Sequence, residues 1–368
     1  MKKILIIKLW AIGEVALSTA CIPKLKNKYN DSDIYFLVGE KSKDILENSP
    51  HIKEIISVDE NMFLKPDLIR LLKLIMFLRN QRFDIIVVLH CHTLFSLFSL
   101  LLGAPVRVGL VRPGCRSFYT LQSVSSSNSR HKMLEYLSVL WRLNIDIDYR
   151  DTKIEIFPDK EDRYAVTKLM DENNLESKKF IILSPTGGSN PAAAKFSVNI
   201  KNKLWPISNY KKLCESIINK TDFKVVIVGS KNEEKRADYV TKDTGKERVI
   251  NFTGKTNLRQ LVLLAEQAAV TVTNDSGPMF ILSSSGTPIL VIFGPTDANL
   301  TKPLSENTII MQDKLNCAPC YDSSVFPNIV KDCRKPVCME RITPERVFDK
   351  IREILNLKNS NDKIQSTK

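Results

Sequence analysis

The sequence predicts an α/β protein made of two doubly wound domains, each a parallel sheet with helices on both faces. Short runs of β-branched and other apolar residues alternate with helical patterns along the chain. The alternation restarts after residue 175. The length of 368 residues is also about twice the commonest size of a single domain. We therefore expect two domains that face each other across a cleft.

The predicted strands of the N-terminal half are largely apolar, which is typical of strands buried on both faces of a parallel sheet. They cover residues 4–9, 34–38, 55–58, 85–89 and 106–110. Helical periodicity is found between them at residues 15–26, 67–82 and 131–143.

The C-terminal half repeats the pattern after a short extended run at 153–157 and a charged helix at 160–173. Its predicted strands cover residues 180–184, 224–228, 249–252, 270–273 and 289–293. From these elements we predict domains at residues 1–175 and 176–343, a C-terminal helix at 344–357 and a disordered polar tail at 358–368.

Composition excludes a disordered chain and a small disulfide-stapled module. Hydrophobic residues make up 43% of the chain and charged residues 26%. The net charge of +13 is spread evenly, with +6 in residues 1–160 and +7 in residues 161–368. A dispersed excess argues against a basic nucleic-acid arm and for work near anionic sugars, nucleotides or membrane surfaces. Because Lys8 interrupts the first apolar run, no signal peptide is expected, and we predict a cytoplasmic protein.

Ligands of doubly wound folds gather at the carboxyl ends of the strands, so the loops there are the candidate sites. Glu14 opens a helix after the first strand, and it is either a carboxylate aimed into the cleft or an ordinary helix-start acid. A glycine-rich turn at 184–189 precedes Lys203, a pairing that suits a phosphate. Glu233 follows another strand, where a ribose ligand and a solvated helix start are both open. Asp275 ends a fourth strand beside Ser276 and Gly277, a combination that suits a sugar diphosphate.

These loops resemble glycosyltransferase family 9, whose best-known members are the ADP-heptose:lipopolysaccharide heptosyltransferases. The resemblance runs from Lys3 to about Leu355 and is most specific at residues 274–297. It is carried by Gly13-Glu14, the segment 103–109, Lys203-Leu204-Trp205-Pro206, Asn274-Asp275-Ser276-Gly277-Pro278-Met279, Phe293-Gly294-Pro295-Thr296-Asp297 and the pair Cys317 and Cys320. It implies a GT-B fold of two Rossmann-like domains, an inverting reaction without a catalytic metal or other required cofactor, and a nucleotide sugar held by the C-terminal domain.

The resemblance also implies a role for each matching residue. Glu14 stands where the family usually has an Asp proposed as the general base, and it is one methylene longer. Phe280 replaces a His that commonly follows Gly-Pro-Met, which removes a donor near the phosphates. The implied donor-binding residues are Thr186, Gly187 and Lys203 for the diphosphate, Glu233 for the ribose, Asp275 for the heptose hydroxyls, and Ser276 with Gly277 for a phosphate.

The acceptor is indicated by an interval without acidic residues between Asp84 and Glu135. Arg107, Arg112 and Arg116 fall within it, and they suit a phosphorylated or carboxylated acceptor such as the Kdo-lipid A core that the family often uses. The helix at 67–82 has basic residues beside a leucine-rich face. It either packs on the core with a basic solvent side or lies against a membrane surface.

Four cysteines near the C-terminus have spacings that a structural zinc or iron site could use, and free thiols are the alternative. They are Cys317, Cys320, Cys333 and Cys338.

The combined prediction is an inverting glycosyltransferase at the inner face of the inner membrane. It moves a sugar, heptose from ADP-heptose in the first instance, to a lipopolysaccharide core-type anionic glycolipid. The alternatives left open are another nucleotide sugar, a protein acceptor, or a catalytically weak relative that binds a sugar nucleotide.

Overall fold

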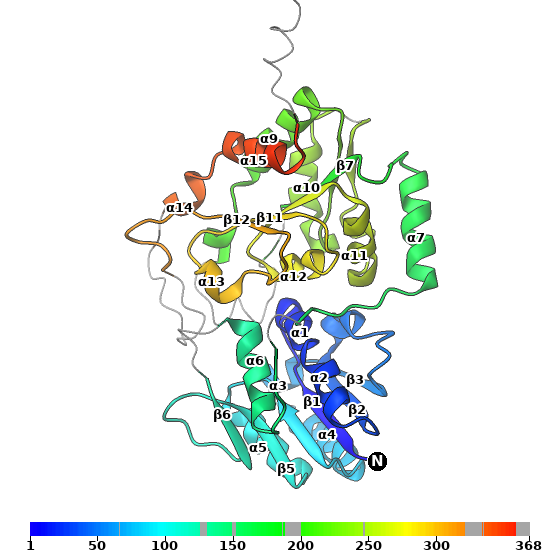
Figure 1. Ribbon diagram of the computed structural model, residues 1–368, viewed down its shortest axis with the longest axis vertical. Coiled ribbons are helices and arrows are strands. Elements are labelled where there is room, and N and C mark those ends of the chain that lie inside the picture. The colour runs from blue at the N-terminus through cyan, green and yellow to red at the C-terminus, as the bar shows by residue number, and fades with distance from the viewer. Residues whose placement is uncertain are drawn as a thin grey trace, which may run out of the picture. The chain divides into compact units, whose positions relative to one another are not determined.

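The computed structural model describes residues 1–65, 67–125, 131–148, 152–185, 187, 200–245, 247–320, 333 and 335–357. The chain divides into two compact units, Met1–Phe157 and Pro158–Lys368. Within the described residues each unit contains one six-stranded sheet in which every strand pair is parallel (Figure 1). The predicted fold class is thereby confirmed.

The N-terminal sheet has the strand order β3-β2-β1-β4-β5-β6. Its strands are β1 (Lys3–Ile7), β2 (Asp33–Gly39), β3 (Glu54–Val58), β4 (Ile85–Val88), β5 (Val106–Val111) and β6 (Leu121–Val124). The helices are α1 (Ile12–Ser18), α2 (Cys21–Lys28), η1 (Glu40–Ile45), α3 (Asn61–Leu64), α4 (Leu68–Asn80), α5 (Thr93–Leu102) and α6 (Lys132–Trp141).

Burial on both faces explains why the central strands β1, β2 and β4 are largely apolar. Successive side chains of a strand point to opposite faces of its sheet. Leu5 and Ile7 of β1 lie in a core cluster with Leu78 of α4 and Phe95 of α5. Ile6 is equally buried and points to the opposite face.

The C-terminal sheet has the order β12-β11-β10-β7-β8-β9. Its strands are β7 (Phe180–Ser184), β8 (Lys224–Ile227), β9 (Val249–Asn251), β10 (Val270–Asn274), β11 (Ile289–Ile292) and β12 (Thr308–Met311). The helices are α7 (Lys160–Asp171), η3 (Ile200–Lys203), α9 (Ile207–Lys220), η4 (Lys231–Glu233), α10 (Glu234–Thr241), α11 (Leu258–Gln267), α12 (Gly277–Ser283), α13 (Ala298–Thr301), α14 (Val337–Glu340) and α15 (Pro344–Ile354).

The last helices of the chain are part of the C-terminal core. Val347 and Phe348 of α15 pack in one cluster with Leu213 of α9 and Val225 of β8. Trp205 is wholly buried in the same cluster, and its indole N–H donates to the carbonyl of Ile342 (2.6 Å). Residues 337–354 therefore complete the domain, while the polar tail predicted at 358–368 lies outside the described residues.

The boundary between the two compact units lies between Phe157 and Pro158, earlier in the chain than the domain boundary predicted at residue 175. Helix α7 explains the difference because it is fastened to α11 of the second unit. Its Asp162 side chain, almost wholly buried, accepts from Arg259 (2.6 Å) and from Asn257 (3.0 Å). The Arg259 and Asn257 hydrogen bonds lower the pKa of Asp162 against the raising effect of burial.

The structure differs from the prediction at one helix and at two strands. The extended run at 153–157 forms neither a helix nor a strand. The helix expected at 15–26 is two helices, α1 and α2. Strands β6 and β12, each at a sheet edge, were not expected. No helix among the described residues is both long enough and apolar enough to cross a bilayer.

Candidate functional site

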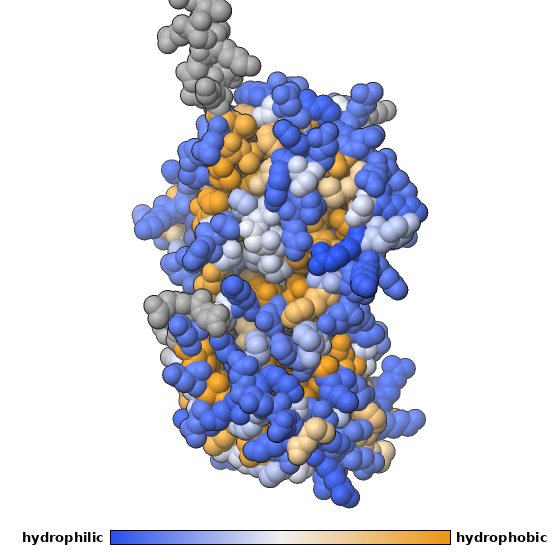
Figure 2. Space-filling view, turned by 45° about the vertical axis from the view of Figure 1, so that its right-hand side comes forward, coloured by the Kyte–Doolittle hydropathy of each residue, from blue (hydrophilic) through white to orange (hydrophobic). Residues whose placement is uncertain are grey.

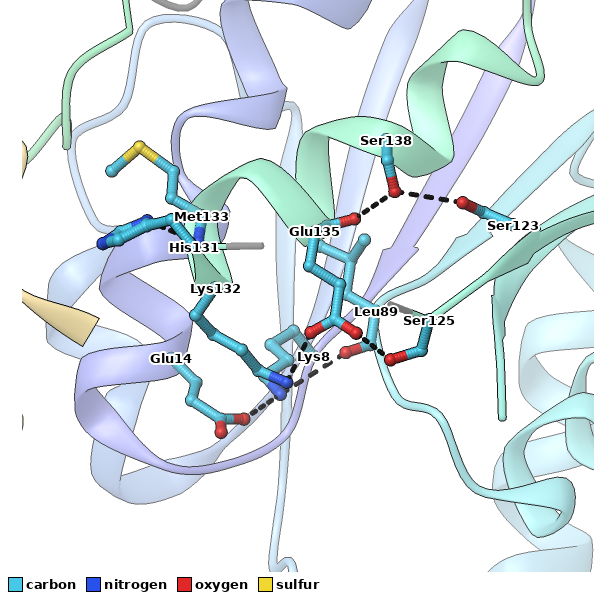
Figure 3. A network of polar contacts seen from close by, with 10 residues as sticks. All are labelled: Lys8, Glu14, Leu89, Ser123, Ser125, His131, Lys132, Met133, Glu135 and Ser138. Carbon is cyan, nitrogen blue, oxygen red and sulfur yellow. Dashed lines mark hydrogen bonds and ion pairs between the residues drawn. The ribbon is translucent and has the colours of Figure 1, made fainter. Parts of the chain in front are cut away.

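Glu14 lies at the carboxyl end of β1, in the first turn of α1. Lys8 follows the same strand and donates to the Glu14 carboxylate (Figure 3). The side chain of Lys8 is 3% exposed, whereas 41% of the Glu14 side chain is exposed. The ammonium group also lies 3.4 Å from the carbonyl oxygen of Leu89, at the end of β4. The predicted base is therefore an accessible carboxylate that forms an ion pair with a buried lysine.

A second ion pair lies beside the first at the start of α6. Lys132 donates to Glu135 (2.7 Å), whose other carboxylate oxygen accepts from the Ser125 hydroxyl (Figure 3). Tyr136 is wholly buried, and the ammonium groups of Lys8 and Lys132 lie 5.0 and 5.5 Å from the centre of its ring. Both lysines are thus held close to Glu14.

These charges set the protonation of the site. Burial raises the pKa of Glu14, but Lys8 and then Lys132 outweigh it and bring the pKa from 4.5 to about 2. Burial lowers the pKa of Lys132, but Glu14 and Glu135 outweigh it and raise that pKa. Burial also raises the pKa of the Tyr136 hydroxyl, and both carboxylates add to the effect. Glu14 therefore stays ionised at neutral pH.

Sequence reasoning named Glu14 but missed Lys8 as a partner. The signal was present, because Lys8 follows a strand that is otherwise apolar. Such a lysine is rarely buried without a partner.

Histidines near this edge of the sheet have structural contacts. Nε2 of His90 accepts from the backbone N–H of Leu9 (2.9 Å), and its ring stacks on Phe95 at 4.2 Å. Burial, Lys8 and Lys132 lower the pKa of His90, so the ring is neutral. His92 and His131 accept from backbone N–H groups at the starts of α5 and α6.

The three arginines expected to bind the acceptor have different environments. Nη1 of Arg107 donates to the Ala104 carbonyl (2.6 Å), and Nε and Nη2 both donate to the Phe118 carbonyl (3.3 Å each). Arg107 therefore fastens the segment between β5 and β6. Arg112 directly follows β5, and Arg116 is exposed in the same segment. Because carboxyl ends of parallel strands share one edge, Arg112 lies on the same edge as Glu14.

In the C-terminal unit, Glu233 joins the loops that follow β7 and β8. One carboxylate oxygen accepts from the Gly187 N–H (2.8 Å), and the other accepts from the N–H and hydroxyl of Ser230 (2.9 and 2.7 Å). Gly187 has φ +139°, and a Cβ there would lie 2.7 Å from the Cβ of Ser276. Only glycine fits this conformation and this close approach.

Lys203 and Asp275 form an ion pair with Nζ 2.9 Å from Oδ2, although 72 positions separate them in the sequence. Trp205 sets this arrangement. Its backbone N–H donates to the side chain of Asn274 (3.0 Å), the last residue of β10, while its indole is buried in the core. The loop with Lys203 is thereby fastened to the strand that presents Asp275.

The structure brings Gly187, Lys203, Glu233, Asp275 and Ser276 to one region, at the carboxyl ends of β7, β8 and β10. The hydroxyl of Ser276 makes no hydrogen bond with the part of the chain that is described. Gly277 begins α12, while Thr186 lies outside the described residues. Phe280, which stands in place of the family's usual His, is 7% exposed and packs as a core residue.

The four C-terminal cysteines lie near a segment that is only partly described. Burial raises the pKa of Cys320 and that of Cys338, the latter to about 11, with neighbouring thiols as the next cause. Among the residues with described positions, no group of three or more His, Cys, Asp or Glu side chains is arranged to hold a metal ion. The expected zinc or iron site stays a prediction.

A family model described as glycosyltransferase family 9 (heptosyltransferase) matches residues 71–329. The chain belongs to this family. Lipooligosaccharide heptosyltransferase 2 of Haemophilus ducreyi is 24% identical over 328 residues, which cover 84% of this chain and 88% of the relative. The heptosyltransferase 2 of Haemophilus influenzae is 34% identical, but over only 113 residues, 30% of this chain and 32% of the relative.

The solved structure of E. coli ADP-heptose LPS heptosyltransferase II has the same fold as this family 9 chain. Its TM-score is 0.74 with 20% sequence identity, and the match covers 96% of this chain and 98% of the other. The two Rossmann-like units are therefore those of the predicted GT-B fold.

Proposed function

We propose that this family 9 glycosyltransferase moves a heptose from ADP-heptose to an anionic, lipopolysaccharide core-type glycolipid with inversion at the anomeric carbon. The observation that carries the proposal is the gathering of Lys203, Asp275, Glu233 and Ser276 in the C-terminal unit. The names of the relatives, which are heptosyltransferases, support the choice of sugar.

The C-terminal unit is proposed to hold the donor. Lys203 supplies a positive charge for the diphosphate, and the Ser276 hydroxyl and Gly277 N–H offer further donors to a phosphate oxygen. Asp275 accepts from sugar hydroxyls while it remains close to Lys203. Glu233, whose oxygens are held by Gly187 and Ser230, presents its remaining lone pairs to the ribose hydroxyls.

The transfer is a single displacement. The acceptor hydroxyl oxygen forms a bond to the anomeric carbon, the bond from that carbon to the phosphate oxygen breaks, and ADP leaves with the electron pair. The hydroxyl proton passes to the carboxylate of Glu14. A carboxylate with a pKa of about 2 is a weak base. It therefore accepts the proton late, after the new carbon–oxygen bond has made that proton acidic.

Lys203 is proposed to stabilise the negative charge that grows on the departing diphosphate. In other transferases a divalent cation stabilises this charge, so we propose a reaction that needs no metal. On the acceptor side, Arg112 and Arg116 are proposed to pair with phosphate or carboxylate groups of the glycolipid. The enzyme then works in the cytoplasm at the inner face of the inner membrane.

The decisive experiment combines binding with turnover. Thermal shift against ADP-, GDP- and UDP-sugars identifies the donor, because a ligand at 100 times its Kd adds about 2.7 kcal/mol of stability. Release of ADP from ADP-heptose is then measured with a Kdo-lipid A acceptor. If the chain binds ADP-heptose but releases no ADP with any acceptor, it is a sugar-nucleotide-binding relative instead. A larger thermal shift with a GDP- or UDP-sugar would mean that this sugar nucleotide, and not ADP-heptose, is the donor.

A further inference from the structure

Helix α4 exposes apolar side chains on the side that faces away from the core. Its inner side is ordinary, since Leu74, Ile75 and Leu78 are buried. When such a helix lies at the surface of a globular protein in water, its outer side is normally polar. Here it carries Leu68, Ile69, Leu72 and Met76, which are 67%, 69%, 57% and 58% exposed. Helix α4 thus packs on the core and has basic residues on its solvent side, as the simpler of the two expectations has it, but that solvent side is also apolar.

Helix α5 continues the apolar surface. Leu94, Leu97 and Leu101 recur at helical spacing and are 37%, 39% and 43% exposed. The two helices pack together, and Nη1 of Arg79 on α4 donates to the Leu101 carbonyl (3.0 Å). We call the exposed apolar side chains of both helices the α4–α5 face. Hydrophobic residues at the surface stand out among hydrophilic ones in Figure 2.

Every charged side chain on these two helices is basic. Arg70, Lys73 and Arg79 lie on α4, and Arg82 follows it. Neither helix contains an Asp or a Glu. The nearest acid in the sequence, Asp67, caps α4 and pairs with Arg70 at 3.2 Å. The α4–α5 face is therefore apolar with a positive border.

Two occupants of such a face can be compared by charge. Arg70 is paired with Asp67 and Asp59. A second copy of the chain would still bring Lys73 and Arg79 against basic residues of its own kind, which is unfavourable in a symmetric contact. An anionic bilayer offers acyl chains to the leucines and phosphate groups to the arginines. We propose that the α4–α5 face docks on the surface of a membrane rich in anionic phospholipid.

The α4–α5 face lies next to the segment that contains Arg112 and Arg116. The hydroxyl of Thr93, the first residue of α5, lies 3.5 Å from the Arg116 carbonyl. Phe118 of the same segment is 42% exposed. The inference deepens the proposed function, because a docked α4–α5 face would bring glycolipid head groups to Arg112 and Arg116.

Co-sedimentation with vesicles tests the proposal without any sugar nucleotide. The full chain is mixed with vesicles of phosphatidylcholine alone or of phosphatidylcholine and phosphatidylglycerol in equal parts. The wild type should bind the anionic vesicles more tightly. Combined Ile69→Gln, Leu72→Gln and Met76→Gln substitutions should reduce this binding about tenfold or more, because apolar area no longer leaves water on docking.

The matched control carries Tyr164→Gln, Leu304→Gln and Val337→Gln, at hydrophobic positions of the C-terminal unit that are 71%, 38% and 43% exposed. It should bind vesicles like the wild type. Equal binding by the α4 variant and the wild type would overturn the proposal, as would equal binding to both vesicle types. Analytical ultracentrifugation adds a further check. A wild-type dimer that the α4 substitutions dissociate, with vesicle binding unchanged, would assign the face to a second copy.

Failure of the docking proposal can be distinguished from failure of the proposed function. Vesicle binding needs no turnover, and ADP release with a detergent-dispersed acceptor needs no bilayer. The α4 variant should keep wild-type ADP release in detergent and lose it only with acceptor embedded in vesicles. Loss of release in both formats would contradict a docking role for this face.

Discussion

Replacing Lys8 by Met should raise the pKa of Glu14. Met is similar in length and apolar, so it fills the buried space of Lys8 without its charge. Among the groups that lower the pKa of Glu14, Lys8 is the strongest and Lys132 the next. The fold should survive, because 41% of the Glu14 side chain is exposed and can be hydrated once its partner is gone.

The size of the shift follows from the electrostatics of the site. The surroundings hold the pKa of Glu14 at about 2 instead of 4.5. Solvent screens part of the attraction, and Lys132 remains in the variant. We therefore expect an increase of about one to two pKa units on losing Lys8. Since the carboxylate is the active form of a base, the acid limb of kcat/KM should move to higher pH by the same amount.

The assay is a ¹³C NMR titration of glutamate labelled at the side-chain carboxyl, in which the resonance absent from Glu14→Gln identifies Glu14. Lys53→Met, at an exposed lysine of the same unit, is the matched control and should leave the titration unchanged. A Glu14 pKa near 4.5 in the wild type would refute the reasoning. So would a Glu14 pKa that is the same in Lys8→Met and the wild type.

Other predictions concern the donor, the base and the acceptor. Glu14→Gln should lower kcat about 10²- to 10⁴-fold with donor affinity kept, and Glu14→Asp should retain more activity; wild-type turnover in Glu14→Gln would make Glu14 a helix-start acid. Lys203→Ala should weaken binding of both ADP and ADP-heptose about tenfold or more by calorimetry. Asp275→Ala should instead make the affinities for ADP and ADP-heptose more alike, because Asp275 is proposed to contact only the sugar. Unchanged affinities in both variants would contradict the proposed donor site. Combined Arg112→Ala and Arg116→Ala should raise the acceptor KM in steady-state kinetics, with a smaller effect at high salt, where ions already screen the contacts. An equal loss of donor binding would place these arginines on the nucleotide. Wild-type turnover should persist in EDTA, and a loss that added Mg²⁺ restores would contradict the metal-independent reaction.

Most of the strands that sequence reasoning found are buried on both faces, as β1, β4, β7, β10 and β11 are. Strand β7, Phe180–Ser184, is wholly apolar up to its last residue and was predicted with its observed bounds. Strand β6, Leu121–Val124, alternates buried and exposed positions and pairs with β5 alone. Its formation depends on main-chain pairing at a sheet edge, which leaves little trace in side-chain chemistry.

The candidate site was predictable one loop at a time but not as pairs. Asp275 and Glu233 stood out because each follows a strand, and position relative to a strand is a local property. The ion pair of Lys203 with Asp275 and the bond from Gly187 to Glu233 depend on strand order, which brings β7 between β8 and β10. No local pattern contains that order.

The indole of Trp205 ties the donor region to the end of the chain. Its partner is the carbonyl of Ile342, just before α15, while its backbone N–H holds Asn274 next to Asp275. Proteolysis before Ile342 would therefore do more than trim a terminus. It would leave a buried indole N–H without its acceptor and open the core around Trp205. A cut more than sixty residues after Asp275 in the sequence would therefore disturb the positions of Asp275 and Lys203. An intact segment from Ile342 to α15 is thus a condition for the sugar-nucleotide binding that we propose.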